Sequence, residues 1–275
     1  MSLTPTARAR IEEIAGDLMK CPASEIARAL KGDASSPLHG PLHLNQEGAF
    51  TAAYAPFDWI NDQADVILVG VTPGLQQAIE ALATLRGRLA SGATIEAAAE
   101  AAKKSASFKG MRTLAARLMD NLKLAAVFDL PSCDDLFGPA AGRVHSTSVL
   151  RYPVFKNGEN FAGDKRILKR PMMQTMIEDH LVPELARFSN AWIVPFGINA
   201  LTVLENLATR GLLDGERVLG GVLHPSGQQW NRYNVQLGMT TGAAALTVPG
   251  GRDVLLRSAA LREKATRIVA LRKAA

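Results

Sequence analysis

Four short apolar runs, rich in β-branched residues, recur along the chain between stretches long enough for helices. They occupy residues 65–70, 143–149, 191–195 and 217–223. Apolar runs without polar alternation are typical of strands buried on both faces, and their spacing suits right-handed crossovers. The pattern predicts a three-layer α/β/α sandwich with a central, mainly four-stranded parallel sheet.

Helical periodicity fills most of the intervening chain. Apolar residues recur every three or four positions over residues 75–89, and Pro73 and Gly74 mark the start of that helix. Further helices are expected over residues 94–104, 114–124, 172–188 (interrupted near Pro183), 200–210 and 254–271. We expect one α/β domain, composed of an N-terminal helix (6–31) and loop within residues 1–60, a core over 61–235 and a basic C-terminal helix over 252–275.

Composition and charge exclude several classes of protein. Of the 275 residues 47% are hydrophobic, as in an ordinary globular protein. Two cysteines, Cys21 and Cys133, are too few for a disulfide framework or for a four-cysteine zinc or iron–sulfur site. There is no secretion signal and no apolar run of about 18 residues, so we expect a soluble, cytoplasmic protein without a membrane partner.

The net charge of +5 is unevenly distributed. Residues 252–275 contain seven basic and two acidic residues and account for all of it. Two other basic stretches, 102–123 and 151–170, flank predicted strand ends, where they could meet the phosphates of a nucleic acid.

Two turns that directly follow predicted strands carry candidate chemistry. Gly70-Val71-Thr72-Pro73-Gly74 follows the first strand and His224-Pro225-Ser226-Gly227 follows the fourth. Ligands of parallel sheets sit beyond the carboxyl ends of the strands. No glycine-rich dinucleotide or nucleotide phosphate loop occurs, so a dinucleotide enzyme is not expected.

These two turns, in this order, resemble the signature motifs of the uracil-DNA glycosylase superfamily. Residues 107–112 resemble the family's Phe-x-Gly segment, residues 147–153 its second strand, and residues 185–204 its third strand with the following helix. The resemblance covers roughly residues 64–235. It implies a uracil-DNA glycosylase-like fold and an enzyme of base-excision DNA repair that needs neither a cofactor nor a metal.

The resemblance also implies roles for individual residues. The enzyme would bind duplex or single-stranded DNA, flip out uracil or another damaged base and hydrolyse its N-glycosidic bond. His224 would stabilise the charge that develops on the departing base, and Thr72 would orient the attacking water. Phe108, Ser148 and Val71 would contact the base. Contacts to phosphates and the DNA duplex would come from Pro73, Gly74, Ser226, Gly227, Gln228, Trp230 and Arg151.

The sequence departs from the superfamily at its water-positioning residue. Much of the superfamily has a carboxylate or carboxamide where this chain has Val71 and Thr72, and neither can act as a general base at neutral pH. Asp58 or Asp62 could supply a carboxylate, but solvated loop charges are the better expectation. Two alternatives stay open, namely a catalytically silent nucleic-acid-binding relative and an enzyme acting on a free nucleobase or nucleoside.

Overall fold

The computed structural model describes residues 2–274, whose contacts form two compact units that alternate along the chain. The first unit comprises Met1–Asp62, Val71–Lys109 and Ser146–Phe188, and the second comprises Gln63–Gly70, Gly110–His145 and Ser189–Ala275. The fold is mixed α/β, as the apolar runs predict. None of the helices over residues 2–274 combines the length and the apolar character needed to cross a membrane.

The N-terminal helical segment of the first unit is divided. Instead of one helix over 6–31 there are α1 (Pro5–Lys20) and α2 (Ala23–Leu30), separated at Cys21 and Pro22. Proline disfavours the helical conformation of the residue before it, and Cys21 is extended. Thr4 caps α1 by accepting the N–H of Ala7.

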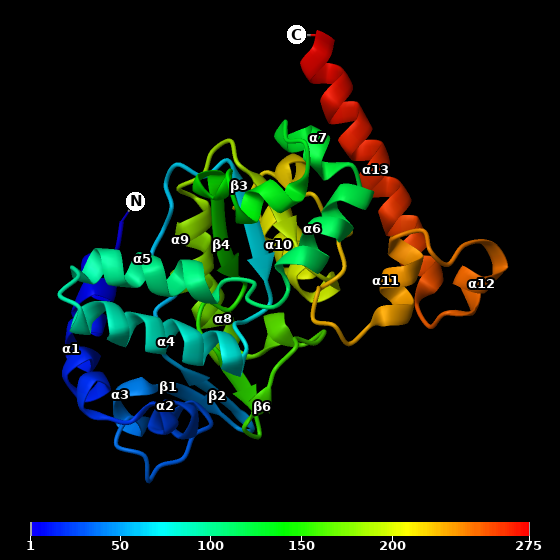
Figure 1. The fold of residues 1–275 in the computed structure, drawn as a ribbon. Helices are drawn as coiled ribbons and strands as arrows, with labels where there is room; N and C mark the ends of the chain where they lie inside the picture. Colours follow the sequence, from blue (N-terminus) through cyan, green and yellow to red (C-terminus); the bar gives the residue numbers. More distant parts are fainter. Residues whose placement is uncertain (1, 275) are drawn as a thin grey trace. The chain divides into compact units, whose positions relative to one another are not determined.

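Helices α4 (Leu75–Ala90) and α5 (Ile95–Ala106) lie side by side in the same unit (Figure 1). Both confirm the sequence prediction. Alanines on their buried faces, such as Ala78 and Ala81 of α4 and Ala98 and Ala102 of α5, allow close packing of the two helices.

The first unit also contains an antiparallel sheet that the sequence prediction did not include. Its strands, in the order β1-β2-β5-β6, are β1 (His43–Glu47), β2 (Phe50–Ala53), β5 (Val154–Lys156) and β6 (Glu159–Asn160). Asn157 and Gly158 connect β5 to β6 with φ values of +51° and +77°. Asn-Gly is the residue pair that favours a two-residue hairpin turn with positive φ at both positions.

The helical segment before residue 188 is continuous through the predicted interruption. It runs from α8 (Pro171–Met176) through a π-helical turn (Ile177–Leu181) into α9 (Val182–Leu185). In the wider turn the N–H of Val182 bonds to the carbonyl of Ile177. Pro183 then falls in the first turn of α9, where its missing N–H costs no hydrogen bond.

A three-stranded parallel sheet confirms three of the four predicted strands. Its order is β4 (Val144–Ser148), β3 (Val66–Gly70) and β7 (Trp192–Pro195). β3 pairs with β7 in parallel, and all five of its residues are buried. Burial of the whole strand explains why its sequence is apolar throughout.

The prediction of a fourth strand is wrong, because residues 217–223 form no regular strand. They make two isolated parallel bridges, in which Leu219 donates to the carbonyl of Ile193 and Gly197 to that of Val222. Gly220 and Gly221 interrupt the ladder between these bridges. A Cβ on Gly221 (φ +134°) would lie 3.0 Å from the carbonyl oxygen of Arg257, so the backbone here lies close against helix α13 (Gly251–Ala274).

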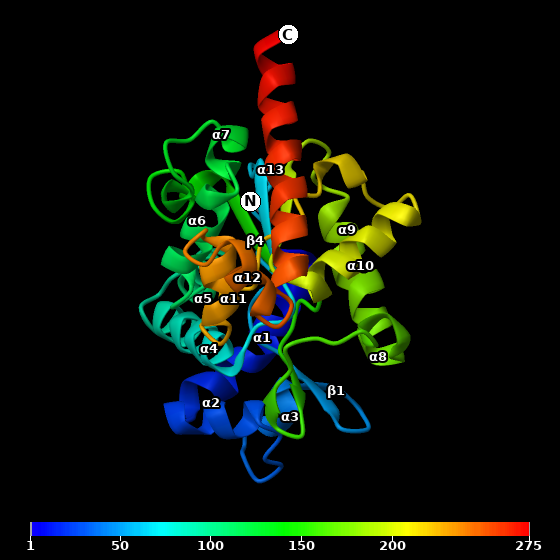
Figure 2. The ribbon, with the colours of Figure 1, turned by 90° about the vertical axis from the view of Figure 1, so that its right-hand side faces the viewer.

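The remaining helices of the second unit are α6 (Arg112–Asn121), α7 (Leu124–Phe128), α10 (Ile198–Thr209), α11 (Trp230–Gln236), α12 (Gly242–Thr247) and α13 (Gly251–Ala274). The helix predicted over 114–124 is confirmed as α6, but it ends at Asn121, and Lys123, which has a φ of +64°, separates it from α7. The predicted basic C-terminal helix is confirmed as α13, with α11 and α12 against its N-terminal half (Figure 2). Short 3-10 helices occupy Cys133–Phe137, Ala141–Arg143, Ile167–Lys169 and Gly215–Arg217.

Candidate functional site

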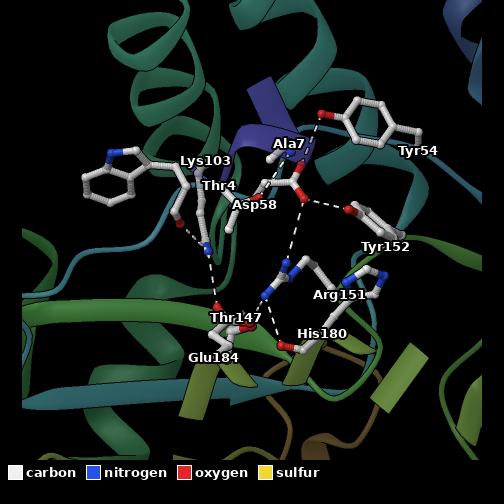
Figure 3. A network of polar contacts seen from close by, with 11 residues as sticks. Thr4, Ala7, Tyr54, Asp58, Lys103, Thr147, Arg151, Tyr152, His180 and Glu184 are labelled. Carbon is white, nitrogen blue, oxygen red and sulfur yellow. Dashed lines mark hydrogen bonds and ion pairs between the residues drawn. The ribbon is translucent and has the colours of Figure 1, made fainter. Parts of the chain in front are cut away.

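The first unit contains a buried network of charged and phenolic side chains centred on Asp58 (Figure 3). Asp58 is only 3% exposed. Its carboxylate accepts hydrogen bonds from the hydroxyls of Tyr54 (3.0 Å) and Tyr152 (2.5 Å). Nη1 of Arg151 lies 3.8 Å from the same carboxylate. The expectation that Asp58 is a solvated loop charge is therefore wrong.

Glu184 of α9 holds the other end of the network. Glu184 is only 1% exposed. Its carboxylate accepts hydrogen bonds from Nη2 of Arg151 (2.8 Å) and from the hydroxyl of Thr147 (3.0 Å). Nζ of Lys103 lies 3.6 Å from Glu184 and donates to the carbonyl of Trp59 at 2.7 Å. Two carboxylates thus face two cations, and buried charges are tolerated only when they are paired in this way.

Burial shifts the titration of several members of this network. It lowers the pKa of Lys103 from 10.5 to about 8, although Glu184 acts in the opposite direction. Burial and the charge of Asp58 raise the pKa of both Tyr54 and Tyr152, so both phenols stay protonated and donate to Asp58. Side chains with shifted pKa values are common at functional sites, and they also occur in ion-pair networks that are purely structural.

A cavity of about 780 Å³ lies beside this network, within the first unit. Asp58, Arg151 and Tyr152 form part of its polar wall, and Met172 and Met176 form part of its apolar wall. This size falls in the range of sites for small molecules, and the combination of apolar surface with a few fixed polar groups is typical of such sites.

His180 also lines this cavity. Its ring meets the ring of Tyr152 edge to face, with centroids 5.0 Å apart. Burial, together with the positive charge of Arg151, lowers the pKa of His180. A neutral imidazole has one donor and one acceptor nitrogen, so this side chain can both give and accept a hydrogen bond.

The first predicted turn is fixed by hydrogen bonds within the first unit. The carbonyl of Val71 accepts the N–H of Leu150. The Thr72 hydroxyl donates to the carbonyl of Tyr152 and accepts the N–H of Val154, both at 3.0 Å. Water orientation by Thr72 stays a prediction, and it would use the lone pair that these bonds leave.

The predicted phosphate contacts at the start of α4 already have internal partners. The N–H of Gly74 donates to the side chain of Gln77 (3.0 Å), and that of Leu75 donates to the side chain of Asn160 (2.8 Å). Pro73 is buried. DNA would have to replace Gln77 and Asn160 to reach these two N–H groups.

Three other residues of the first unit, Phe108, Ser148 and Arg151, were predicted to contact the base or the DNA backbone. Phe108 is 5% exposed and has a φ of +52°, and Ser148 is partly buried at the end of β4. Arg151, predicted to contact phosphate, is 8% exposed, and its charge is used by Glu184 and Asp58 inside the unit. The structure therefore places Arg151 in the internal network and not on the protein surface.

His224 belongs to the second unit, whereas Thr72, Phe108 and Ser148 belong to the first. It follows the bridge-forming segment, and its backbone carbonyl accepts the hydroxyl of Tyr233 (2.8 Å). A Cβ on Gly197 would lie 3.1 Å from Cβ of His224. Burial lowers the pKa of His224, which favours the neutral ring at pH 7.

The residues after His224 are accessible, as a DNA-contacting turn requires. Ser226, Gly227 and Gln228 are exposed. Trp230, at the start of α11, is 57% exposed and meets Tyr233 edge to face. Contact of these residues with DNA stays a prediction.

Gly197 gives a test of how closely the His224 turn must pack. Gly197→Ala is expected to lower the free energy of unfolding by roughly 1–3 kcal/mol, because alanine disfavours a φ of +84° and its Cβ would crowd His224. Urea denaturation followed by circular dichroism measures the change. Gly87→Ala is the matched control, since Gly87 lies in a helix with open space around it and should tolerate alanine. Equal stability of Gly197→Ala and the parent protein would contradict the packing argument.

The arrangement defines a mixed α/β protein with a buried ion-pair network beside a cavity. No model of a protein family and no solved structure matches the chain. The uncharacterized protein YoxB of Bacillus subtilis (strain 168) is 34% identical over 202 residues, which span 72% of this chain and 79% of that protein. The chain belongs to the same family as YoxB.

Proposed function

We propose that the chain is a DNA glycosylase of the uracil-DNA glycosylase type, which hydrolyses the N-glycosidic bond of a damaged base in DNA. In this proposal the parallel sheet, with residues 218–222 as an incomplete fourth strand, is the centre of a three-layer α/β/α core. The position of His224 carries the proposal. It follows the last parallel segment of the sheet, where ligands of such sheets bind.

Catalysis by His224 would depend on its neutral state. Cleavage of the glycosidic bond leaves negative charge on the departing base, and a fixed N–H donor stabilises that charge as it develops. The hydrogen bond from Tyr233 and the close approach of Gly197 hold the His224 backbone in place. A preorganised donor needs no rearrangement when the bond breaks.

The turn over residues 70–74 would contribute less to catalysis than the same turn of a glycosylase that has a carboxylate there. Thr72 is not a general base at neutral pH, and its hydroxyl already bonds to Tyr152 and Val154. We therefore expect slow base release. The same observation favours a second candidate, a catalytically silent relative that binds nucleic acid through Ser226, Gly227, Gln228 and Trp230.

Base release by the purified full chain tests the proposal. Duplexes and single strands carrying uracil, hypoxanthine, xanthine or an alkylated base are incubated with protein, and the freed base is measured. His224→Ala is expected to reduce release by roughly 10²–10³-fold, the usual effect of losing one such donor. His180→Ala replaces another histidine whose pKa burial lowers, and it should retain release because His180 is not among the residues predicted to contact the base, the attacking water or the DNA.

Three outcomes separate the candidates. Release that His224→Ala abolishes and His180→Ala retains supports the glycosylase. DNA binding that weakens with salt, survives His224→Ala and yields no free base supports the silent relative. Absence of DNA binding at low salt contradicts both.

A further inference from the structure

We infer that the cavity of the first unit binds a small, uncharged heteroaromatic molecule with the size and hydrogen-bonding edge of a nucleoside. This inference goes beyond the proposed glycosylase and does not depend on it. The cavity wall contains none of the strand-end residues Thr72, Phe108 and His224. It is formed by α1, β1, β2, α8, the π-helical turn and α9, together with the loops that carry Asp58 and Tyr152.

The charges around the cavity favour an uncharged ligand. At the polar wall, Asp58 and Glu184 already face the guanidinium of Arg151. Two more arginines of the wall are paired as well, Arg10 with Glu13 at 2.7 Å and Arg187 with Asp62 at 2.5 Å. An anionic ligand would have to break one of these pairs and would be repelled by Asp179, which also lines the wall, whereas a neutral ligand would leave the pairs intact.

The hydroxyl groups of the polar wall have a fixed direction. Tyr54 and Tyr152 both donate their protons to Asp58, so their oxygens can act toward a ligand only as acceptors. His180 adds one donor and one acceptor in its neutral form. The wall therefore matches a polar edge that carries N–H or O–H donors next to an acceptor, as heterocyclic bases and their ribosides do.

The rest of the wall suits the faces of a flat ring. Met172 and Met176 are buried at 6% and 7% exposure, and thioether side chains pack adaptably against aromatic faces. The ring of His180 stands edge to face against Tyr152 on the same wall. A free sugar has no aromatic face to offer these groups, so a sugar alone should bind poorly.

Calorimetric titration of the full chain with adenosine, guanosine, cytidine and uridine tests the inference. At least one nucleoside is expected to bind with a dissociation constant of about 1 mM or tighter. The corresponding 5′-monophosphate should bind no more tightly, and glucose should not bind. Binding of the monophosphates alone, or of glucose alone, would overturn the inferred ligand class.

A pair of variants on α8 locates the site. Thr175 is exposed and lines the cavity, so Thr175→Trp should fill it and weaken nucleoside binding by roughly tenfold or more, about 1.4 kcal/mol. Gln174→Trp is the matched control, because Gln174 is exposed on the same helix but does not line the cavity. Binding by Gln174→Trp alone supports the inference, whereas unchanged binding by Thr175→Trp overturns it.

The outcome is distinguishable from that of the glycosylase assay. His224→Ala should leave nucleoside binding unchanged, since His224 is not among the residues that line the cavity. Nucleoside binding without any base release would contradict the glycosylase alone. Base release with no nucleoside bound by any folded variant would contradict the cavity alone.

Discussion

Glu184→Ala is expected to lower the free energy of unfolding by roughly 3–5 kcal/mol, the largest effect of any single substitution considered for this protein. The replacement leaves the cations of Arg151 and Lys103 buried at 8% and 3% exposure with one of their carboxylates missing. The hydroxyl of Thr147 loses its acceptor as well. A buried charge without its partner costs far more than a surface charge, because water cannot replace the lost interaction.

Urea denaturation of Glu184→Ala measures this effect, and Glu100→Ala is its matched control. Glu100 also pairs with a lysine, Lys104, but on the exposed side of α5. Such surface pairs contribute about 0–1 kcal/mol. A loss below about 1 kcal/mol for Glu184→Ala would contradict this expectation, and it would mean that the buried charges are relieved without Glu184, for instance by loss of the Lys103 proton.

The double variant Glu184→Gln with Lys103→Met separates the ion pair from packing. Lys103→Met removes the cation that Glu184→Gln alone would leave without its partner. The double variant should therefore be less destabilised than the sum of the two single variants. Additive losses would mean that Lys103 and Glu184, 3.6 Å apart, do not interact energetically. The pair would then contribute only through its separate hydrogen bonds.

Local sequence patterns predicted the parallel strands well, because hydrophobic runs reflect burial directly. β3 is apolar at every position, and the structure buries every position. The fourth run contains two glycines, and a Cβ on Gly220 would clash with Leu201 while a Cβ on Gly221 would crowd Arg257, so this segment is shaped by its close approach to other helices. These are tertiary contacts with distant helices, and no window of sequence contains them.

The buried network escaped prediction for a similar reason. Tyr152 and Asp58 are 94 positions apart in the sequence, and Arg151 and Glu184 are 33 apart. One local signal was present, since Asp58 lies in the aromatic and apolar run from Tyr54 to Ile60. A lone carboxylate in such a run indicates a buried charge, and a buried charge requires a partner elsewhere in the chain.

The same network predicts an alkaline optimum of stability. The pKa of Lys103 is about 8 in the folded protein and 10.5 ordinarily, so between these values the unfolded chain binds more protons. The titration of Lys103 by itself should therefore raise stability by about 2 kcal/mol between about pH 8 and pH 10. Above pH 10 the stability should fall again. The ordinary tyrosine pKa is 10.0, and Tyr54 and Tyr152 keep their protons in the folded protein after the unfolded chain has lost them.

Urea denaturation at intervals from pH 7 to pH 11 measures both parts of this profile. Lys103→Met should remove the rise and keep the fall, because methionine does not titrate and the two phenols still donate to Asp58. Tyr152→Phe should reduce the fall and keep the rise. A steady decline from pH 7 in the parent protein would contradict the lowered pKa of Lys103, since only a group that is deprotonated early in the folded state stabilises the protein as the pH increases.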